Sequence, residues 1–274
     1  MHGTDQGRYI VTKTTVSGTR EWAATSANVM QGCSHDCRYC YARSRASQIE
    51  SPWVNESVQP NLLAKEFGKR KGTVMFPTQH DITPENLPYT GEILRRLLAA
   101  GNNVLVVTKP HREVVMELCA LFGEYKGQIL FRFTIGSRND RTLSLWEPGA
   151  PGYQERLSAL KYARNSGFAT GVSMEPILDT DEDHIVSTFY ELLPFVTDAI
   201  WLGKMNRVIE RLTANGFNED EELMDAATML MASQSDERIA KLYARLMDEP
   251  KVKWKESIKI VVGIAVPTEA GLDV

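Results

Sequence analysis

The sequence predicts an α/β fold built on a parallel sheet. Short runs of apolar and β-branched residues recur about every thirty residues along the 274-residue chain, and most are separated by stretches of helical periodicity. Two of the runs, 104–107 and 258–262, show little alternation, as strands buried on both faces do. Strand and helix alternating at this spacing indicate βαβ units with right-handed crossovers.

In chain order, the predicted strands cover residues 27–30, 73–76, 104–107, 129–135, 171–174, 199–202 and 258–262. Between them, apolar side chains fall on one helical face at Ile93, Leu94, Leu97 and Leu98, and again within 114–122 and 185–193. Cys119 lies on the apolar face of the second of these helices, so we expect it to be an ordinary core residue.

The ends of the chain differ from this regular middle. Residues 1–22 are polar and mixed, which predicts an N-terminal arm before a barrel-like unit over 23–206. Residues 207–250 are charged, rich in methionine and helical in pattern, so 207–274 is expected to be a helical extension, or lid, with a final strand. No repeat or clear linker interrupts the sequence, which favours one domain.

Composition narrows the class of protein. Hydrophobic residues make up 43% and charged residues 24%, and the net charge of −4 gives no bulk attraction to nucleic acid or an anionic membrane. No apolar run approaches the ~20 residues of a membrane span. We therefore expect a soluble, cytoplasmic protein. Three of the four cysteines lie within eight residues, which indicates metal or redox chemistry in a reducing compartment.

The cysteine segment reads Cys33-Ser-His-Asp-Cys37-Arg-Tyr-Cys40, a C-x3-C-x2-C spacing. Three thiolates on one short loop can each bond an iron of a cubane cluster and leave the fourth iron open. Two alternatives compete with this interpretation. Cys37 and Cys40 alone would suit a thiol–disulfide pair, and the three thiolates with His35 would suit structural zinc.

This spacing, on the loop after the first predicted strand and with the aromatic Tyr39 before the third cysteine, resembles the radical S-adenosylmethionine (SAM) superfamily. The resemblance implies a partial (β/α)6 barrel with a helical C-terminal insertion, its site at the C-terminal ends of the strands. It implies a 4Fe–4S cluster on Cys33, Cys37 and Cys40. It also implies an oxygen-sensitive enzyme that cleaves SAM reductively to a 5′-deoxyadenosyl radical, with electrons from a flavodoxin or ferredoxin type of donor.

Within the superfamily, residues 30–180 resemble spore photoproduct lyase and its relatives. The similarity is carried by Cys37-Arg-Tyr-Cys40-Tyr41, Thr108-Lys109, Phe133-Thr-Ile, Trp146-Glu-Pro-Gly-Ala-Pro, Arg156 and Gly171-Val-Ser-Met-Glu-Pro176. It implies that the Tyr39 backbone contacts the adenine, that Lys109 pairs with the SAM carboxylate, and that Tyr41 relays hydrogen atoms. The other implied cofactor-binding residues are His80, Thr134, Ser173 and Glu175.

Structural roles are open for several of these residues. Lys109 would also suit a solvated turn, His80 a satisfied loop histidine, Thr134 an ordinary strand position and Glu175 a surface acid. Arg156 is expected to pair with a nearby carboxylate.

The sequence departs from the resemblance at one loop. Thr78-Gln-His-Asp81 replaces the usual glycine-glycine-glutamate run, and Thr78 is the position nearest the cysteine that donates hydrogen in the lyase. A hydroxyl O–H bond is too strong for that task. We therefore expect a lyase or transferase acting on a small molecule or peptide. A DNA-lesion repair enzyme is the alternative and a non-catalytic zinc module the third; a nucleic-acid partner is not favoured, and no membrane partner is expected.

Overall fold

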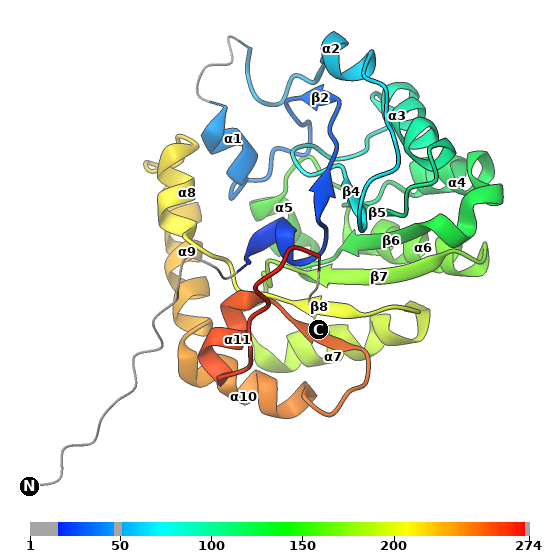
Figure 1. Ribbon diagram of the computed structural model, residues 1–274. Helices are drawn as coiled ribbons and strands as arrows, with labels where there is room; N and C mark the ends of the chain where they lie inside the picture. The colour runs from blue at the N-terminus through cyan, green and yellow to red at the C-terminus, as the bar shows by residue number, and fades with distance from the viewer. Residues whose placement is uncertain (1–15, 47–50, 272–274) are drawn as a thin grey trace, which may run out of the picture.

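Seven parallel strands form the main sheet of the computed structural model, which describes residues 16–46 and 51–271 (Figure 1). They are β1 (Thr25–Ser26), β4 (Val74–Phe76), β5 (Val104–Thr108), β6 (Ile129–Thr134), β7 (Ala169–Met174), β8 (Ile200–Leu202) and β9 (Val252–Trp254). Their order in the sheet follows their order in the chain, and every neighbouring pair is parallel. Connections that all advance in one direction produce a partial barrel, so the predicted fold is confirmed.

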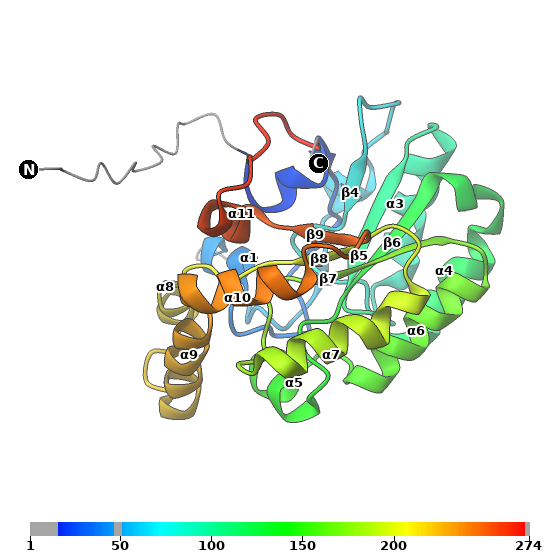
Figure 2. The same cartoon turned by 90° about the horizontal axis from the view of Figure 1, so that it is seen from below.

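Helices cover the outer face of this sheet, where α6, α7 and α10 lie side by side in Figure 2. The covering helices are α3 (Leu87–Ala99), α4 (Arg112–Leu121), α6 (Tyr153–Asn165), α7 (Glu182–Leu192) and α10 (Asp236–Leu246). The predicted apolar face of α3 is buried, and Cys119 on α4 is 7% exposed within the core, as expected. Asp181 caps α7 by accepting a hydrogen bond from the Asp183 amide at 2.8 Å.

Several further elements are short connections. They are the 3-10 helices η1 (Gly18–Glu21), η2 (Gly123–Gln128) and η3 (Leu193–Phe195), the helices α1 (Tyr41–Arg45), α2 (Pro60–Leu63) and α5 (Asp140–Trp146), and a separate antiparallel pair of β2 (Met30–Gln31) with β3 (Ser57–Val58).

The first predicted strand, 27–30, is wrong as a single element. Strand β1 ends at Ser26, and the Ala27 amide still donates to the Met75 carbonyl at 3.0 Å. The chain then leaves the sheet, because the Val29 amide donates instead to the ring of His80 at 3.2 Å. Met30 pairs with Val58 in the small antiparallel sheet, and this turn away from the barrel starts the cysteine loop.

The last predicted strand, 258–262, is also wrong. These residues belong to the helix α11 (Glu256–Val262), and the final strand is β9 at Val252–Trp254. A short apolar run does not distinguish a buried strand from a buried helix by its periodicity. The true strand alternates Val252 and Trp254, both buried, with a half-buried Lys253, a pattern of only three residues.

The helical stretch predicted at 207–250 is confirmed as α8 (Val208–Ala214), α9 (Glu221–Ser233) and α10. Helix α10 packs on α7, whereas α8 lies against α1 beside the cysteine loop (Figure 1). After α8, the side-chain amide of Asn215 donates to the Arg38 carbonyl at 2.8 Å and to the Cys40 carbonyl at 3.1 Å. The connection from β8 to β9 therefore supports the site as well as leading to the last strand of the sheet.

The predicted arm falls largely outside the described residues, because only 16–22 of it belong to them. This part lies against the C-terminal segment: the Val16 amide donates to the Pro267 carbonyl at 3.0 Å, and the Gly271 amide to the Arg20 carbonyl at 2.8 Å. None of the helices in the described part of the chain combines the length and apolarity needed to cross a bilayer.

Candidate cluster and cofactor site

A cavity of about 710 Å³ opens at the C-terminal ends of the central strands. All ten predicted site residues line it, although they come from five separate segments: Cys33, Cys37, Tyr39, Cys40, Tyr41, His80, Lys109, Thr134, Ser173 and Glu175. The volume suits a small ligand or cofactor, for which pockets of about 300–1,000 Å³ are usual. The fold thus brings the predicted residues together, while their individual roles stay predictions.

The three motif cysteines are free thiols on one loop, with Cys33 and Cys37 buried and Cys40 half-buried. Backbone hydrogen bonds fix the loop: the Cys33 amide donates to the Trp53 carbonyl at 2.8 Å, and the Arg38 amide to the Trp146 carbonyl at 2.9 Å. Burial raises the pKa of Cys37 to about 12 and that of Cys33 well above its usual value. Thiolates here need positive charge beside them, which an iron–sulfur cluster bound by soft sulfur donors would supply.

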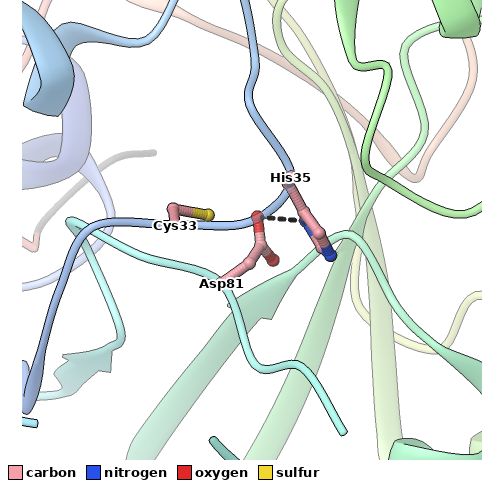
Figure 3. Close-up of side chains that lie close together, drawn as sticks. All are labelled: Cys33, His35 and Asp81. Carbon is pink, nitrogen blue, oxygen red and sulfur yellow. Dashed lines mark ion pairs between the residues drawn. The ribbon is translucent and has the colours of Figure 1, made fainter. Parts of the chain in front are cut away.

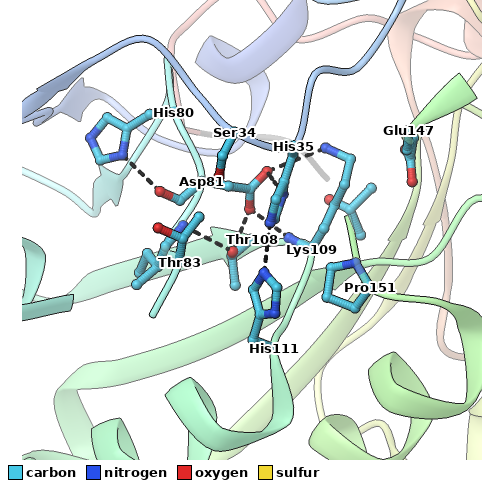
Figure 4. A network of polar contacts seen from close by, with 12 residues as sticks. Ser34, His35, His80, Asp81, Thr83, Thr108, Lys109, His111, Glu147 and Pro151 are labelled. Atoms are coloured by element: carbon cyan, nitrogen blue, oxygen red, sulfur yellow. Dashed lines mark hydrogen bonds and ion pairs between the residues drawn. The ribbon is translucent and has the colours of Figure 1, made fainter. Parts of the chain in front are cut away.

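Asp81 connects this loop to the barrel (Figure 4). Its carboxylate accepts hydrogen bonds from the Thr108 hydroxyl and, at 2.6 Å, from the Lys109 amide, both at the end of β5. The same carboxylate pairs with His35 Nδ1 at 3.1 Å and with Lys109 Nζ at 3.4 Å. Burial would raise the pKa of Asp81, but Lys109 and His35 outweigh it and hold that pKa well below its usual range.

The position of His35 bears on the zinc alternative. Its ring lies with Cys33 and Asp81, their ligand atoms within 4.8 Å of one another, and Figure 3 shows the Asp81 carboxylate between the other two side chains. Both ring nitrogens are engaged, Nδ1 by Asp81 and Nε2 by His111 at 3.0 Å. His35 is therefore placed to orient the cysteine loop, and a metal on it would displace one of these contacts.

A second buried connection runs from Tyr39 to the α6 helix. The Tyr39 hydroxyl donates to Glu147, and the Glu147 carboxylate pairs with Arg156 at 2.6 Å where both side chains are fully buried. Burial raises the pKa of a carboxyl, but the Arg156 guanidinium overcomes this effect and lowers the pKa of Glu147. The predicted pairing of Arg156 with a carboxylate is confirmed. The Tyr39 hydroxyl is held by Glu147 in the protein interior.

Tyr41 is tied to the loop that departs from the superfamily pattern. Its hydroxyl donates to the Thr78 carbonyl, and burial raises the pKa of Tyr41 to about 12. The Thr78 amide donates to Asn28 Oδ1 at 2.8 Å, and Asn28 Nδ2 donates to the Thr78 hydroxyl at 2.9 Å. Thr78 and Tyr41 are thereby held side by side at the cavity wall.

The other predicted cofactor-binding side chains differ in whether they already have hydrogen-bond partners in the protein. His80 accepts from the Val29 amide at Nε2, and its Nδ1 lies 2.9 Å from the Asp81 carbonyl, so a ring nitrogen would have to leave a backbone partner to reach SAM. The Ser173 hydroxyl is the opposite case: it is buried at the cavity and has no hydrogen-bond partner among the described residues. Thr134 is buried, and Glu175 lies 3.4 Å from Lys255 Nζ.

Sequence reasoning missed Asp81, Glu147 and Asn215 as parts of this site. Asp81 directly follows His80 in the loop after β4, where an acidic residue was a usable signal, whereas Glu147 directly follows Trp146 at the end of α5. Nothing in the sequence pointed to Asn215, because its partners Arg38 and Cys40 are more than 170 residues away in the chain.

Gly149 provides a test of the packing behind the cysteine loop. Its amide donates to the His35 carbonyl at 3.1 Å, and an added Cβ would collide with the Ser34 carbonyl oxygen and approach the His35 backbone to 3.1 Å. We expect Gly149→Ala to destabilise the protein by about 1–3 kcal/mol, the usual cost of overpacking, and to lower the iron retained after reconstitution. Gly123→Ala, which meets nothing within 4 Å, is the matched control. Equal iron content and melting temperature in the two variants would contradict this role.

Comparison with known proteins agrees with the fold. A protein of Acidianus two-tailed virus, the uncharacterized protein ORF301, is 26% identical over 252 residues, which cover 83% of this chain and 80% of that protein. A spore photoproduct lyase variant with a dinucleoside spore photoproduct superposes with a TM-score of 0.54 at 16% identity, over 84% of this chain and 75% of that one.

The Streptococcus suis enzyme SuiB bound to its precursor peptide SuiA has a TM-score of 0.55 at 8% identity, covering 90% of this chain and 54% of SuiB. These similarities support the fold alone. The profile of the radical SAM superfamily matches residues 27–193, more than half of the chain and the whole cysteine motif. The protein belongs to the radical SAM superfamily.

Proposed function

We propose that this protein is an enzyme that cleaves SAM reductively and directs the resulting radical to a small-molecule or peptide substrate. The observation that carries the proposal is the convergence of three free cysteines and seven predicted cofactor and substrate residues on one cavity. When bound, a 4Fe–4S cluster with one open iron supplies the electron that breaks the sulfonium–carbon bond of SAM and yields a 5′-deoxyadenosyl radical.

The chain's own residues would hold and orient these groups. Cys33, Cys37 and Cys40 would hold three irons, while Asp81 and His35 keep the loop in register with β5. Lys109 carries three N–H donors, and its single ion pair with Asp81 at 3.4 Å leaves donors for the SAM carboxylate. Ser173, with its unpartnered hydroxyl, and Glu175 would take hydroxyl or amino groups of the cofactor, and Tyr41 would relay hydrogen atoms.

The substrate class is argued from the site's size and from Thr78. A cavity of about 710 Å³ that also takes SAM leaves room for a modest substrate portion, such as a small molecule or one side chain of a peptide. SuiB bound to a peptide has this fold, which supports the peptide alternative. Repair of a DNA lesion is the second candidate, favoured by the similarity to spore photoproduct lyase. We also propose a flavodoxin or ferredoxin type of electron donor.

Replacing any one motif cysteine tests the core of the proposal. We expect the reconstituted protein to contain about four irons per chain, as one 4Fe–4S cluster requires. Cys33→Ala, Cys37→Ala and Cys40→Ala should each abolish SAM cleavage, measured as 5′-deoxyadenosine formed under dithionite without oxygen. Cys119→Ala, which lies on α4 away from the cavity, is the control and should keep the activity. Full cleavage by any of the three motif variants would contradict the assignment.

The proposed role of Lys109 has a separate readout. Removing its ammonium in Lys109→Met should weaken SAM binding to the cluster-loaded protein about tenfold or more, because a charge-assisted hydrogen bond to a carboxylate is worth about 1.5–3 kcal/mol. Iron content should stay unchanged. Lys161→Met, half-buried on the outer helix α6, is the matched control. If SAM affinity is the same in both variants, Lys109 does not bind the cofactor.

DNA repair is tested by turnover of a dinucleotide spore photoproduct. Thr78 cannot quench a substrate radical as a thiol does, and its hydroxyl already bonds to Asn28. The net charge of −4 gives no general counterion-release drive toward duplex DNA. We expect no efficient thymine recovery and weak duplex binding at physiological salt. Clean thymine formation over many turnovers would move the repair function to first place.

A further inference from the structure

Basic side chains outnumber acidic side chains in the lining of the cavity. Six basic residues line it, namely Arg20, Arg45, Lys109, Lys204, Arg207 and Arg211, against the acids Asp81, Glu175 and Glu256. Lys109 pairs with Asp81, Lys204 with Asp236 at 3.4 Å, and Arg207 with Glu210. The side chains of Arg20, Arg45 and Arg211 have no hydrogen bond or ion pair with other described residues. The overall negative charge of the chain concealed this basic rim.

Two of these arginines lie on helices that pack together beside Tyr41. The Arg45 guanidinium lies over the Tyr41 ring, 5.4 Å from its centroid, at the end of α1. Arg211 comes from α8, which packs against α1, and it lines the same cavity as Tyr41 and Arg45. Arg45 is exposed at the rim, whereas Arg211 is half-buried.

The half-buried guanidinium of Arg211 lines the cavity and has no side-chain partner among the described residues, so its five N–H donors are available to a ligand there. Burial lowers the pKa of Arg211. The planar fork of arginine matches a carboxylate or phosphate in two parallel hydrogen bonds, and two such forks around one point make a site for an oxyanion.

We propose that Arg45 and Arg211 bind an oxyanionic group of the substrate, a carboxylate or a phosphate, and so hold the substrate beside Tyr41. This inference rests on the proposed function and names the class of its substrate. SAM is a rival occupant, since it also carries a carboxylate. The exposed position of Arg45 at the rim favours a molecule that enters from outside over a cofactor seated at the cysteines.

Anion binding to the purified full-length protein tests the inference without any turnover. Inorganic phosphate and, in a separate arm, glutarate are titrated at constant ionic strength, with calorimetric detection. We expect saturable binding of at least one probe, and the better probe identifies the anion type. Arg45→Met and Arg211→Met should each weaken that binding at least tenfold. Arg141→Met, with a side chain 91% exposed on α5, removes the same charge elsewhere and should bind as the parent does.

Arg211→Lys keeps the positive charge but loses the planar guanidinium, so this variant should bind the anion with intermediate affinity. It also provides the test if Arg211→Met fails to fold. No saturable binding of either probe, or equal binding by parent and variants, overturns the inference. So does a loss of SAM affinity in cluster-loaded Arg211→Met with unchanged anion binding, because Arg211 would then be a cofactor ligand. Specific anion binding by a protein that never cleaves SAM would instead refute the proposed function and leave this site standing.

Discussion

The buried carboxylate of Asp81 is the constraint on which the site depends. It accepts from the end of β5 through Thr108 and Lys109, and it pairs with His35 from within the cysteine loop. A loop of eight residues with three cysteines has no regular secondary structure to fix it. Asp81 fixes this loop to the sheet, because it pairs with His35, which lies between Cys33 and Cys37 in the sequence.

The same carboxylate organises the charges of the interior. Without a partner, an ionised group at this depth would be costly, and so would the ammonium of Lys109. Burial opposes the charge of Lys109, but Cys37, Tyr39 and Asp81 outweigh it and raise the pKa of Lys109 well above its usual value. Glu147 with Arg156 repeats this arrangement at the Tyr39 hydroxyl. Two buried ion pairs thus contact the cysteine loop, one through His35 and the other through Tyr39.

The mouth of the cavity is built by parts of the chain outside the regular barrel. Helix α8 and Asn215 support the cysteine loop from one side, and residues 16–22 join the C-terminal segment on the other. Lys255 connects residues 16–22 to the end of the barrel strand β7, because its buried ammonium pairs with Glu21 at 2.9 Å and with Glu175 at 3.4 Å. The barrel strands therefore present the predicted cofactor residues, while the extensions contribute to the walls and charge of the opening.

The sequence by itself determined the fold class and the metal-binding motif. The longer strands and helices were predicted because each buries a continuous apolar face that shows in the sequence pattern. They are β5, β6, α3, α4 and α7. The C-x3-C-x2-C motif was recognisable because its ligands are neighbours in the chain. Among the short runs, 73–76 and 199–202 fall on β4 and β8, whereas two others failed: 27–30 and 258–262 are apolar runs too brief to show a period, and tertiary contacts decided that the second is a helix.

Only the tertiary structure decided which polar groups are satisfied and which are free. His80 looked like a cofactor ligand, yet Val29 and the Asp81 backbone occupy its ring, whereas the hydroxyl of Ser173 is left without a partner. The basic rim was invisible in a chain of net charge −4, because Arg45 and Arg211 are brought together only by the packing of α1 on α8. Hydrogen bonding and charge pairing depend on distances in space, and the linear order of residues carries no such distances for segments so far apart.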